Sequence, residues 1–428
     1  MSLNWSYVAE QYIAGILGMV PEVGSMLSAF LYILWPSPTE DVWAEVQAQT
    51  EELIDEKLDA SVQEQVNADL AGLYNVITDY LNEVPTDDYA EIARRWTSAK
   101  EVFLATIPTF MMKDYQFLLV TDFVQMGNMY LSLLRDGVIG GPTWGWNEAT
   151  VQNTADELTS RIAEFTNYVQ SVYNTQLATY PNSLTNIYQW NPRNAYIRTM
   201  TLTALDFMNM WPYFDISVYP DPVTFYLDRE IYTDYCGTNT DSGALHIPGP
   251  PSQPITQVSV WGWDRIDAVQ VTYPSGGGPD GETVTPRMGD SSGGANTSPH
   301  GGVFDTSNNA VVQVNLGTSA IINYMYLWFA DGTKSYKLGG NYPGGEDHIF
   351  SFENEIVSSF FINGVSNYYK SADGIVCGFK YINPMPKITP DSEAMYVVLP
   401  KVTQADAPMA WQRKRAEIWG GRKVKKTV

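Results

Sequence analysis

Basic residues, cysteine and histidine are scarce in this chain. Its 428 residues include 25 lysines and arginines against 48 aspartates and glutamates, giving a formal net charge of −23. Nucleic acids are bound by clustered Lys and Arg, so this charge argues against a nucleic-acid partner. Only two cysteines are present, Cys236 and Cys377. They have neither metal nor redox spacing, and we expect them to be buried thiols.

No motif indicates catalysis, a cofactor or a metal. The three histidines, His246, His300 and His348, are expected in loops and lack the close spacing of a metal site. The glycine-rich segment SGGGPDG precedes a strand rather than a helix, so we do not expect it to bind a phosphate. A nucleophile motif is also missing. The sequence therefore predicts a protein that is not an enzyme and holds no cofactor.

The apolar run near the N-terminus, YIAGILGMVPEVGSMLSAFLYILWP, lacks the features of an export signal. Residues 1 to 56 contain neither Lys nor Arg, and Pro21 and Glu22 divide the run. A secretory signal needs a basic segment and an unbroken apolar core. We expect two short helices, Ala14–Val20 and Val23–Trp35.

The first half of the chain shows helical periodicity. Apolar residues recur every three or four positions over long segments joined by short loops, which is typical of a helix bundle. The predicted helices are Val42–Val66, Asn67–Val84, Asp88–Thr106, Asn147–Leu177 and Ile187–Met210.

One segment, DYQFLLVTDFVQMGNMYLSLLRD at 114–136, is apolar nearly all round. Residues Tyr115 to Leu134 would rise about 30 Å as a helix, the thickness of a hydrocarbon core. Its polar residues advance by 3, 3 and 4 and form one stripe, Asp122, Gln125, Asn128 and Ser132. Two interpretations remain open from the pattern alone. The helix could be the buried centre of a bundle, with the stripe bonded to other helices, or it could line water in a membrane oligomer.

After Pro220 the sequence changes to strands, glycine pairs and turns. The segment TQVSVWGWDRIDAVQVTYP alternates, as does AVVQVNLG, and IINYMYLWFADGTKSYKLGG predicts a hairpin with its turn at Asp331-Gly332. Long loops are expected at 275–302 and 339–347. The second half is predicted to be an all-β domain of antiparallel sheets, with its last strand near MYVVLPKV.

Three passages resemble the insecticidal crystal toxins, or delta-endotoxins. The segment YIRTMTLTALDFMNMWPYFDISVYPDPVTFYLDREIYTDYCG, at 196–237, is similar to the family's last bundle helix and the strand that follows it. The segment FVQMGNMYLSLLRDG resembles the family's central helix, and LYILWP before VWAEVQAQTEELIDEKL resembles its first helix junction. The β half resembles the family's second domain, a β-prism, and also jacalin-type lectin prisms.

The sequence departs from the family pattern at several positions. Ile197-Arg198 stand where the family has paired arginines, Tyr130 replaces a central-helix histidine, and Tyr235 replaces a proline. We also expect no third domain, a β-sandwich in the family. These departures concern interdomain charge and target range.

The resemblance implies a multidomain fold of α and β parts. It consists of a seven-helix-type bundle with a central apolar helix at 1–220, a β-prism of antiparallel Greek-key sheets at 221–408, and a basic tail at 409–428. The implied protein is soluble or crystalline in the producing cell and acts at a target-cell membrane.

The implied function is that of a pore-forming insecticidal toxin. The prism would bind a gut receptor protein or glycan, the hairpin of the Asp88–Thr106 and Tyr115–Leu134 helices would insert into membrane lipid, and a homo-oligomer would form the pore. Two alternatives are a lectin-like carbohydrate-binding protein whose helical domain is only structural, and a storage or antitoxin-like relative without pore activity.

The candidate site residues form four groups. The membrane-inserting helix would contribute Tyr115, Phe117, Asp122, Gln125, Asn128 and Ser132. The hairpin tip would contribute Pro108, Phe110, Met111 and Met112. The domain interface would use Arg198, Asp215, Arg229 and Asp234. Receptor loops within 275–302, 339–347 and 364–373 would present Asn341, Tyr342, Tyr368 and Tyr369. The tail, Arg413 to Lys426, is a candidate trimming site or anionic-lipid contact.

Overall fold

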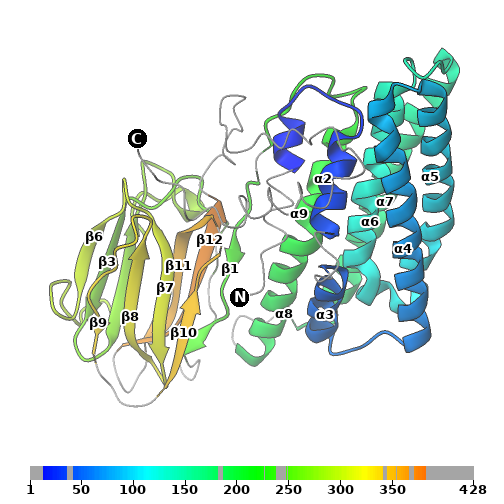
Figure 1. Ribbon diagram of the computed structural model, residues 1–428. Helices are drawn as coiled ribbons and strands as arrows, with labels where there is room; N and C mark the ends of the chain where they lie inside the picture. Colours follow the sequence, from blue (N-terminus) through cyan, green and yellow to red (C-terminus); the bar gives the residue numbers. More distant parts are fainter. Residues whose placement is uncertain are drawn as a thin grey trace. The chain divides into compact units, whose positions relative to one another are not determined.

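The computed structural model describes two compact units (Figure 1). The described residues are 13–35, 42–181, 187–225, 227–237, 247, 249–340, 345–352, 354–365 and 371–381. The helical unit comprises the described residues up to Gln176 together with Met200–Phe225. The β unit comprises Leu177–Thr199 and the described residues from 227 onward.

The helical segments have the bounds expected of a bundle with long helices. They are α2 (Ser25–Leu34), α3 (Val42–Ile54), α4 (Ala60–Glu83), α5 (Tyr89–Phe110), α6 (Gln116–Gly140), α7 (Glu148–Leu177), α8 (Ile187–Met200) and α9 (Asp206–Met210). A π-helical turn, Thr201–Leu205, precedes α9, and a 3-10 turn, Trp211–Phe214, follows it.

Helix α6 is the buried centre of the helical unit. It contacts α2, α3, α5 and α9, and every residue from Leu118 to Gly137 is buried. The segment Lys113–Gly140 is long and apolar enough to cross a membrane. Of its most apolar 18-residue stretch, 94% is buried. A helix that is apolar on all sides requires such an enclosed position in a water-soluble bundle.

The predicted helix boundaries are wrong in two regions. The predicted Val42–Val66 helix is broken, because α3 ends at Ile54, and α4 starts at Ala60 rather than at the predicted Asn67. Asp55 has a left-handed backbone (φ 58°), a conformation that Asp tolerates and that ends a helix.

The second error concerns the end of α5. Pro108 was expected to lie beyond the helix, but α5 continues through it to Phe110. Pro108 has no backbone N–H to bond to the carbonyl four residues earlier. Burial of Ile107 and Phe110 offsets the loss of this one hydrogen bond.

The β unit contains three four-stranded antiparallel sheets. Their strands are β1 (Ile231–Tyr232), β2 (Cys236–Gly237), β3 (Gln257–Gly262), β4 (Ile266–Thr272), β5 (Met288–Gly289), β6 (Gly302–Asp305), β7 (Val311–Thr318), β8 (Ile322–Phe329), β9 (Leu338–Gly339), β10 (Glu346–Phe350), β11 (Glu355–Val365) and β12 (Ala372–Tyr381).

Two of the sheets are Greek keys. Their strand orders are β5-β4-β3-β6 and β10-β7-β8-β9, so the fourth strand of each returns to pair with the first. In the third sheet β12 pairs with β1, β2 and β11. Strand β11 contacts β4, β5 and β7, so the three sheets share one core. The predicted fold class, a bundle with a central apolar helix followed by antiparallel sheets, is confirmed.

Some predicted details lie outside the described residues or stay untested. The strand expected near MYVVLPKV and the basic tail fall in 382–428, which the structure does not describe. The domain boundaries at 220 and 408 stay predictions. Cys236 and Cys377 are buried thiols, as predicted.

Two glycines offer a matched test of packing around α6. A Cβ at Gly137 would lie 2.6 Å from the Trp96 ring, whereas one at Gly72 on α4 meets nothing within 4 Å. Trp96 cannot move aside easily, because its indole N–H donates to the Leu133 carbonyl (2.6 Å). We expect Gly137→Ala to lower the free energy of unfolding by about 1–3 kcal/mol, and Gly72→Ala to raise it by about 0.5–1 kcal/mol. Urea titrations followed by far-UV circular dichroism measure both, and equal effects would contradict this description of the core.

Candidate functional site

Helices α5 and α6 form a hairpin with a short tip. The turn between them is Met111–Met112, followed by the 3-10 turn Lys113–Tyr115. Met111 and Met112 are half-buried and Pro108 is exposed. Phe110 is fully buried within α5 rather than in a loop. The predicted tip is therefore shorter than the segment PTFMMKD, and its membrane role stays a prediction.

The tip of the hairpin is bonded to α4. The Tyr115 hydroxyl donates to the Asp59 carboxylate. The Thr109 hydroxyl donates to Asp69 Oδ2 (2.5 Å) and accepts from Gln65 Nε2 (3.3 Å). Asp59 is the N-cap of α4 and Asp69 lies in its N-terminal half, so this half of the helix holds the tip.

The polar stripe of α6 is buried and engaged. The Trp211 indole N–H donates to Asn128 Oδ1 (2.6 Å), and Asn128 Nδ2 donates to Gln125 Oε1 (3.0 Å). Gln125 Nε2 donates to the carbonyl of Thr203 in the π turn (3.2 Å). Ser132 uses its own helix, donating to the Asn128 carbonyl (2.7 Å). In the folded unit Gln125 and Asn128 therefore find hydrogen-bond partners in the Met200–Phe225 segment, as the buried-helix interpretation predicts.

The remaining predicted residues of this helix also have defined positions. Asp122 is 1% exposed, at the start of the stripe. Phe117 and Tyr115 are half-buried near the tip. Gly127 lets Trp211 approach closely, since a Cβ there would lie 3.3 Å from the indole ring.

One carboxylate on α7 binds both helices of the hairpin. Glu157 Oε2 lies 2.5 Å from Lys100 Nζ on α5, and Glu157 Oε1 accepts from the Tyr130 hydroxyl on α6 (2.8 Å). The side chains of Lys100 and Glu157 are 23% and 24% exposed, so water screens the pair only partly. We call Glu157, Lys100 and Tyr130 the α7 clamp.

A second link joins α6 to α3. The hydroxyl oxygens of Thr50 and Thr121 lie 3.0 Å apart, and both side chains are buried. The clamp and this threonine pair were missed by sequence reasoning. The only signal was Tyr130 itself, which replaces a family histidine.

A buried charged group lies near the other end of α6. Asp136 is fully buried and accepts from the Tyr80 hydroxyl on α4 (3.2 Å), and Arg135 beside it is 2% exposed. Burial, the Asp136 charge and this hydrogen bond raise the pKa of Tyr80 well above its ordinary value. The proton on Tyr80 is therefore part of the contact between α4 and α6.

The four domain-interface candidates make bonds within their own units. In the β unit, Arg198 Nη1 binds Asp234 Oδ1 (3.0 Å), and Arg229 Nη1 binds Glu355 Oε1 (2.6 Å). In the helical unit, Asp215 Oδ2 accepts from the Thr159 hydroxyl (2.6 Å). Their interface role stays a prediction.

The receptor-loop candidates cannot be placed. Asn341, Tyr342, Tyr368 and Tyr369 lie outside the described residues. Among the residues that are described, no group of three or more His, Cys, Asp or Glu side chains could hold a metal ion.

The raised pKa of Tyr80 predicts loss of stability at alkaline pH. Tyrosine in the unfolded chain loses its proton near pH 10, whereas folded Tyr80 keeps it. The unfolded state then binds fewer protons, so the free energy of unfolding falls as pH rises above about 10, by about 1.4 kcal/mol per pH unit. Tyr80→Phe removes this contribution.

Urea unfolding at about pH 8 and about pH 11 measures the effect. At the lower pH we expect Tyr80→Phe to be less stable than wild type by about 1–3 kcal/mol, because Asp136 loses a buried donor. At the higher pH the difference shrinks or reverses. A difference that is the same at both pH values would contradict the prediction.

The comparisons with known proteins agree on one family. The family model described as "delta endotoxin, N-terminal domain" matches residues 12–215. Pesticidal crystal protein Cry26Aa of Bacillus thuringiensis subsp. finitimus is 32% identical over 255 residues, which is 56% of this chain and 22% of that protein. Pesticidal crystal protein Cry1Ea of subsp. kenyae is 29% identical over 230 residues, 52% of this chain and 20% of that protein. The match thus spans about a fifth of the length of these relatives.

Solved structures share the fold over most of the chain. The insecticidal delta-endotoxin Cry8Ea1 from Bacillus thuringiensis superposes with a TM-score of 0.71 at 20% identity, covering 89% of this chain and 74% of that one. The mosquito-larvicidal Cry4Aa toxin from Bacillus thuringiensis gives a TM-score of 0.72 at 17% identity, over 89% and 74%. The helical part of this chain, residues 12–215, therefore belongs to the delta-endotoxin N-terminal domain family, and most of the chain has the fold of these solved toxins.

Proposed function

We propose that this chain is a pore-forming insecticidal toxin that inserts the α5–α6 hairpin into the membrane of gut epithelial cells. One observation carries the proposal. Helix α6 has the length and apolarity of a membrane span, yet it is enclosed at the centre of the helical unit. A helix satisfies its own backbone hydrogen bonds, so α6 can move from a protein interior to lipid without exposing them.

The polar stripe explains why several copies of the hairpin would have to assemble in the membrane. On leaving the bundle, Asn128 and Gln125 lose Trp211 and the Thr203 carbonyl. Unpaired polar groups in lipid are costly, and a charged Asp122 at membrane depth would cost a few kcal/mol more. Assembly of several hairpins around a water-filled channel gives the stripe a wet face. An oligomer is therefore part of the proposal.

Helix α5 suits the role of partner in the hairpin. Its buried residues, including Trp96, Phe103 and Phe110, follow one side, while the exposed Arg94 and Glu101 lie on the other. An amphipathic helix of this kind can cover an apolar helix with one face and contact water with the opposite one. Its exposed Pro108 would lie close to the tip that enters first.

Several sets of polar contacts must break before the hairpin can leave. Besides the bonds of the stripe to Trp211 and Thr203 and the Tyr80–Asp136 bond, they include the α7 clamp, the Thr50–Thr121 pair, and the bonds from Tyr115 and Thr109 to α4. Each joins the hairpin to a helix that stays behind. The barrier to insertion is thus spread over a few identifiable polar contacts and the apolar packing of α6.

The β unit would recognise the target cell, through a receptor protein or a glycan. We further propose that the protein is soluble or a crystalline inclusion in the producing cell and acts after release. The match of the helical unit to the delta endotoxin model favours this toxin role over a lectin whose helical part is only structural.

The α7 clamp gives a direct test, because α7 carries a matched control. Glu157 binds α5 and α6, whereas Glu164 forms an ion pair with Arg161 on its own helix. Glu157→Gln removes the charge that holds Lys100 and should lower the free energy of unfolding by about 1–2 kcal/mol. It should also speed dye release from liposomes made with gut brush-border lipid severalfold. Glu164→Gln should change the free energy of unfolding by no more than about 0.5 kcal/mol. It should leave the rate of dye release nearly unchanged.

Dye release is measured with and without prior limited proteolysis, which separates an effect of trimming from insertion itself. Release by wild type under either condition supports the pore. Faster release by Glu157→Gln indicates that the hairpin must detach from α7 before the pore forms. A folded chain that releases no dye with or without trimming would refute the proposed function. Equal rates for the two variants would refute the role of the clamp.

A further inference from the structure

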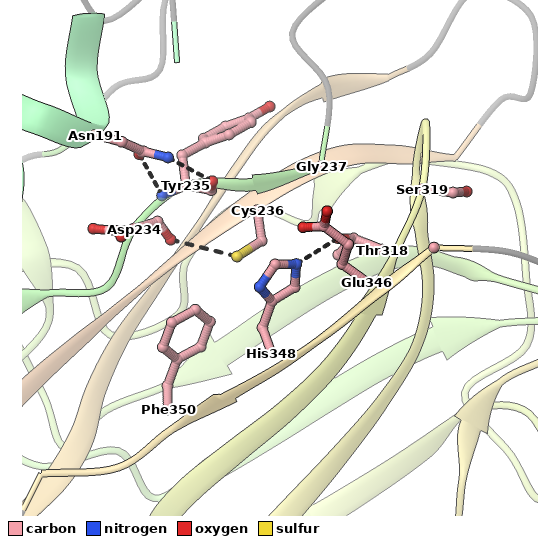
Figure 2. A pocket seen from close by; sticks show the side chains of 11 residues that line it. Asn191, Asp234, Tyr235, Cys236, Gly237, Thr318, Ser319, Glu346, His348 and Phe350 are labelled. Atoms are coloured by element: carbon pink, nitrogen blue, oxygen red, sulfur yellow. Dashed lines mark hydrogen bonds between the residues drawn. The ribbon is translucent and has the colours of Figure 1, made fainter. Parts of the chain in front are cut away.

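The β unit contains a pocket of about 450 Å³ that none of the contacts above explains (Figure 2). It lies between the β1–β2 segment, the end of β7, strand β10 and residue Asn191 of α8. The residues that decide its chemistry are Asp234, Cys236, Thr318, Glu346, His348 and Phe350. Its volume lies within the range of small-molecule sites, about 300–1,000 Å³.

Two parallel rings form one side of the pocket. His348 and Phe350 alternate with Ile349 along β10, so their rings share a face of the strand. The ring planes differ by 1° and the centroids lie 6.1 Å apart. His348 is fixed in place by its Nε2, which lies 2.9 Å from the Thr318 hydroxyl (Figure 2). The rings therefore offer an apolar surface before any ligand arrives.

Carboxylates supply the polar side. Glu346 is exposed at the start of β10, and Asp234 is 43% exposed while bonded to Arg198. Both have acceptor positions left for hydroxyl donors, because an ionised carboxylate has about four lone-pair sites. Both residues line the pocket, with the Cys236 thiol between them donating to the Asp234 backbone carbonyl (3.8 Å) (Figure 2).

The same thiol indicates that the ligand is not held covalently or through a metal. Burial, followed by the charges of Asp234 and Glu346, raises the pKa of Cys236 to about 12. Nucleophilic attack and metal ligation require the thiolate. Cys236 therefore remains a neutral wall of the pocket at neutral pH.

We propose that this pocket binds a pyranose ring of a glycan. The C–H face of the sugar would pack on His348 and Phe350, because aromatic faces carry negative charge density that attracts weakly positive edges and C–H groups. The sugar hydroxyls would donate to Glu346 and Asp234. A neutral polyol fits better than an ammonium group, since Arg198 already compensates the charge of Asp234. This assignment deepens the receptor-binding role proposed above and rests on it.

The test uses the full chain and a panel of methyl pyranosides of glucose, galactose, mannose and their N-acetylamino forms. Isothermal titration calorimetry measures binding, with saturation-transfer NMR for weak ligands. We expect at least one pyranoside to bind, and Glu346→Gln and Phe350→Leu each to weaken it at least tenfold. Glu346 is exposed, so its substitution leaves folding intact.

The opposite face of β10 provides matched controls. Asp347 and Ile349 alternate with the pocket residues and are both exposed. Asp347→Asn and Ile349→Leu should therefore leave the affinity unchanged. Far-UV circular dichroism of every variant confirms that each is folded.

Several outcomes would overturn the proposal. They are the absence of binding by any pyranoside, binding that survives both pocket substitutions, or binding of N-acetyl-lysine amide in place of sugars. Dye release distinguishes this failure from failure of the proposed function. Release without sugar binding would refute the pocket alone, and sugar binding without release would refute the pore alone.

Discussion

The burial of α6 is the constraint on which the helical unit depends. An apolar helix with one polar stripe is stable in water only if other helices enclose it and if some of them supply hydrogen-bond partners. The surrounding helices supply the enclosure, and the Met200–Phe225 segment supplies Trp211 and the Thr203 carbonyl. Gly137 and Gly127 permit the close approach of Trp96 and Trp211 to the helix. The rest of the unit can be understood as a sheath for α6.

The proposed insertion depends on the same constraint. The hairpin is fastened by a small number of polar contacts, of which the α7 clamp is the most economical, because one carboxylate binds both α5 and α6. In lipid the apolar surface of α6 no longer needs the sheath, whereas its stripe still needs partners. Enclosure in a monomer and the proposed assembly in a membrane are two ways to bury the apolar surface of α6 and to give its stripe polar partners. This is the physical basis for reading the helix as both a core and an inserted element.

Sequence alone predicted the features that repeat or run long. The central helix, its stripe, the bundle and the antiparallel sheets followed from periodicity and apolar length, and family resemblance supplied the prism. The break at Asp55 was missed because apolar residues continue in a helical spacing across it. The end of α5 was misplaced because burial of Phe110 outweighed the proline rule at a last turn.

Contacts between distant residues were beyond sequence reasoning. Glu157 is 27 residues from Tyr130 and 57 from Lys100, and nothing local marks it among many carboxylates. The pocket likewise combines segments near 191, 234, 318 and 348, which only the sheet topology brings together. The predicted receptor residues stay predictions, because they lie at positions that the structure does not describe.

If α6 must leave the bundle for the protein to act, a reversible cross-link that holds α6 in place should block its action. The hydroxyls of Thr50 and Thr121 lie 3.0 Å apart, so Thr50→Cys with Thr121→Cys places two thiols within reach of a disulfide between α3 and α6. The measurement is dye release from brush-border liposomes by the oxidised and the reduced double variant, with Thr121→Cys alone as control. We expect no release when the bond is formed, and release at the rate of the single variant after reduction. Release by the fully oxidised protein at the reduced rate would contradict it, because a pore would then form with α6 still bound to its sheath.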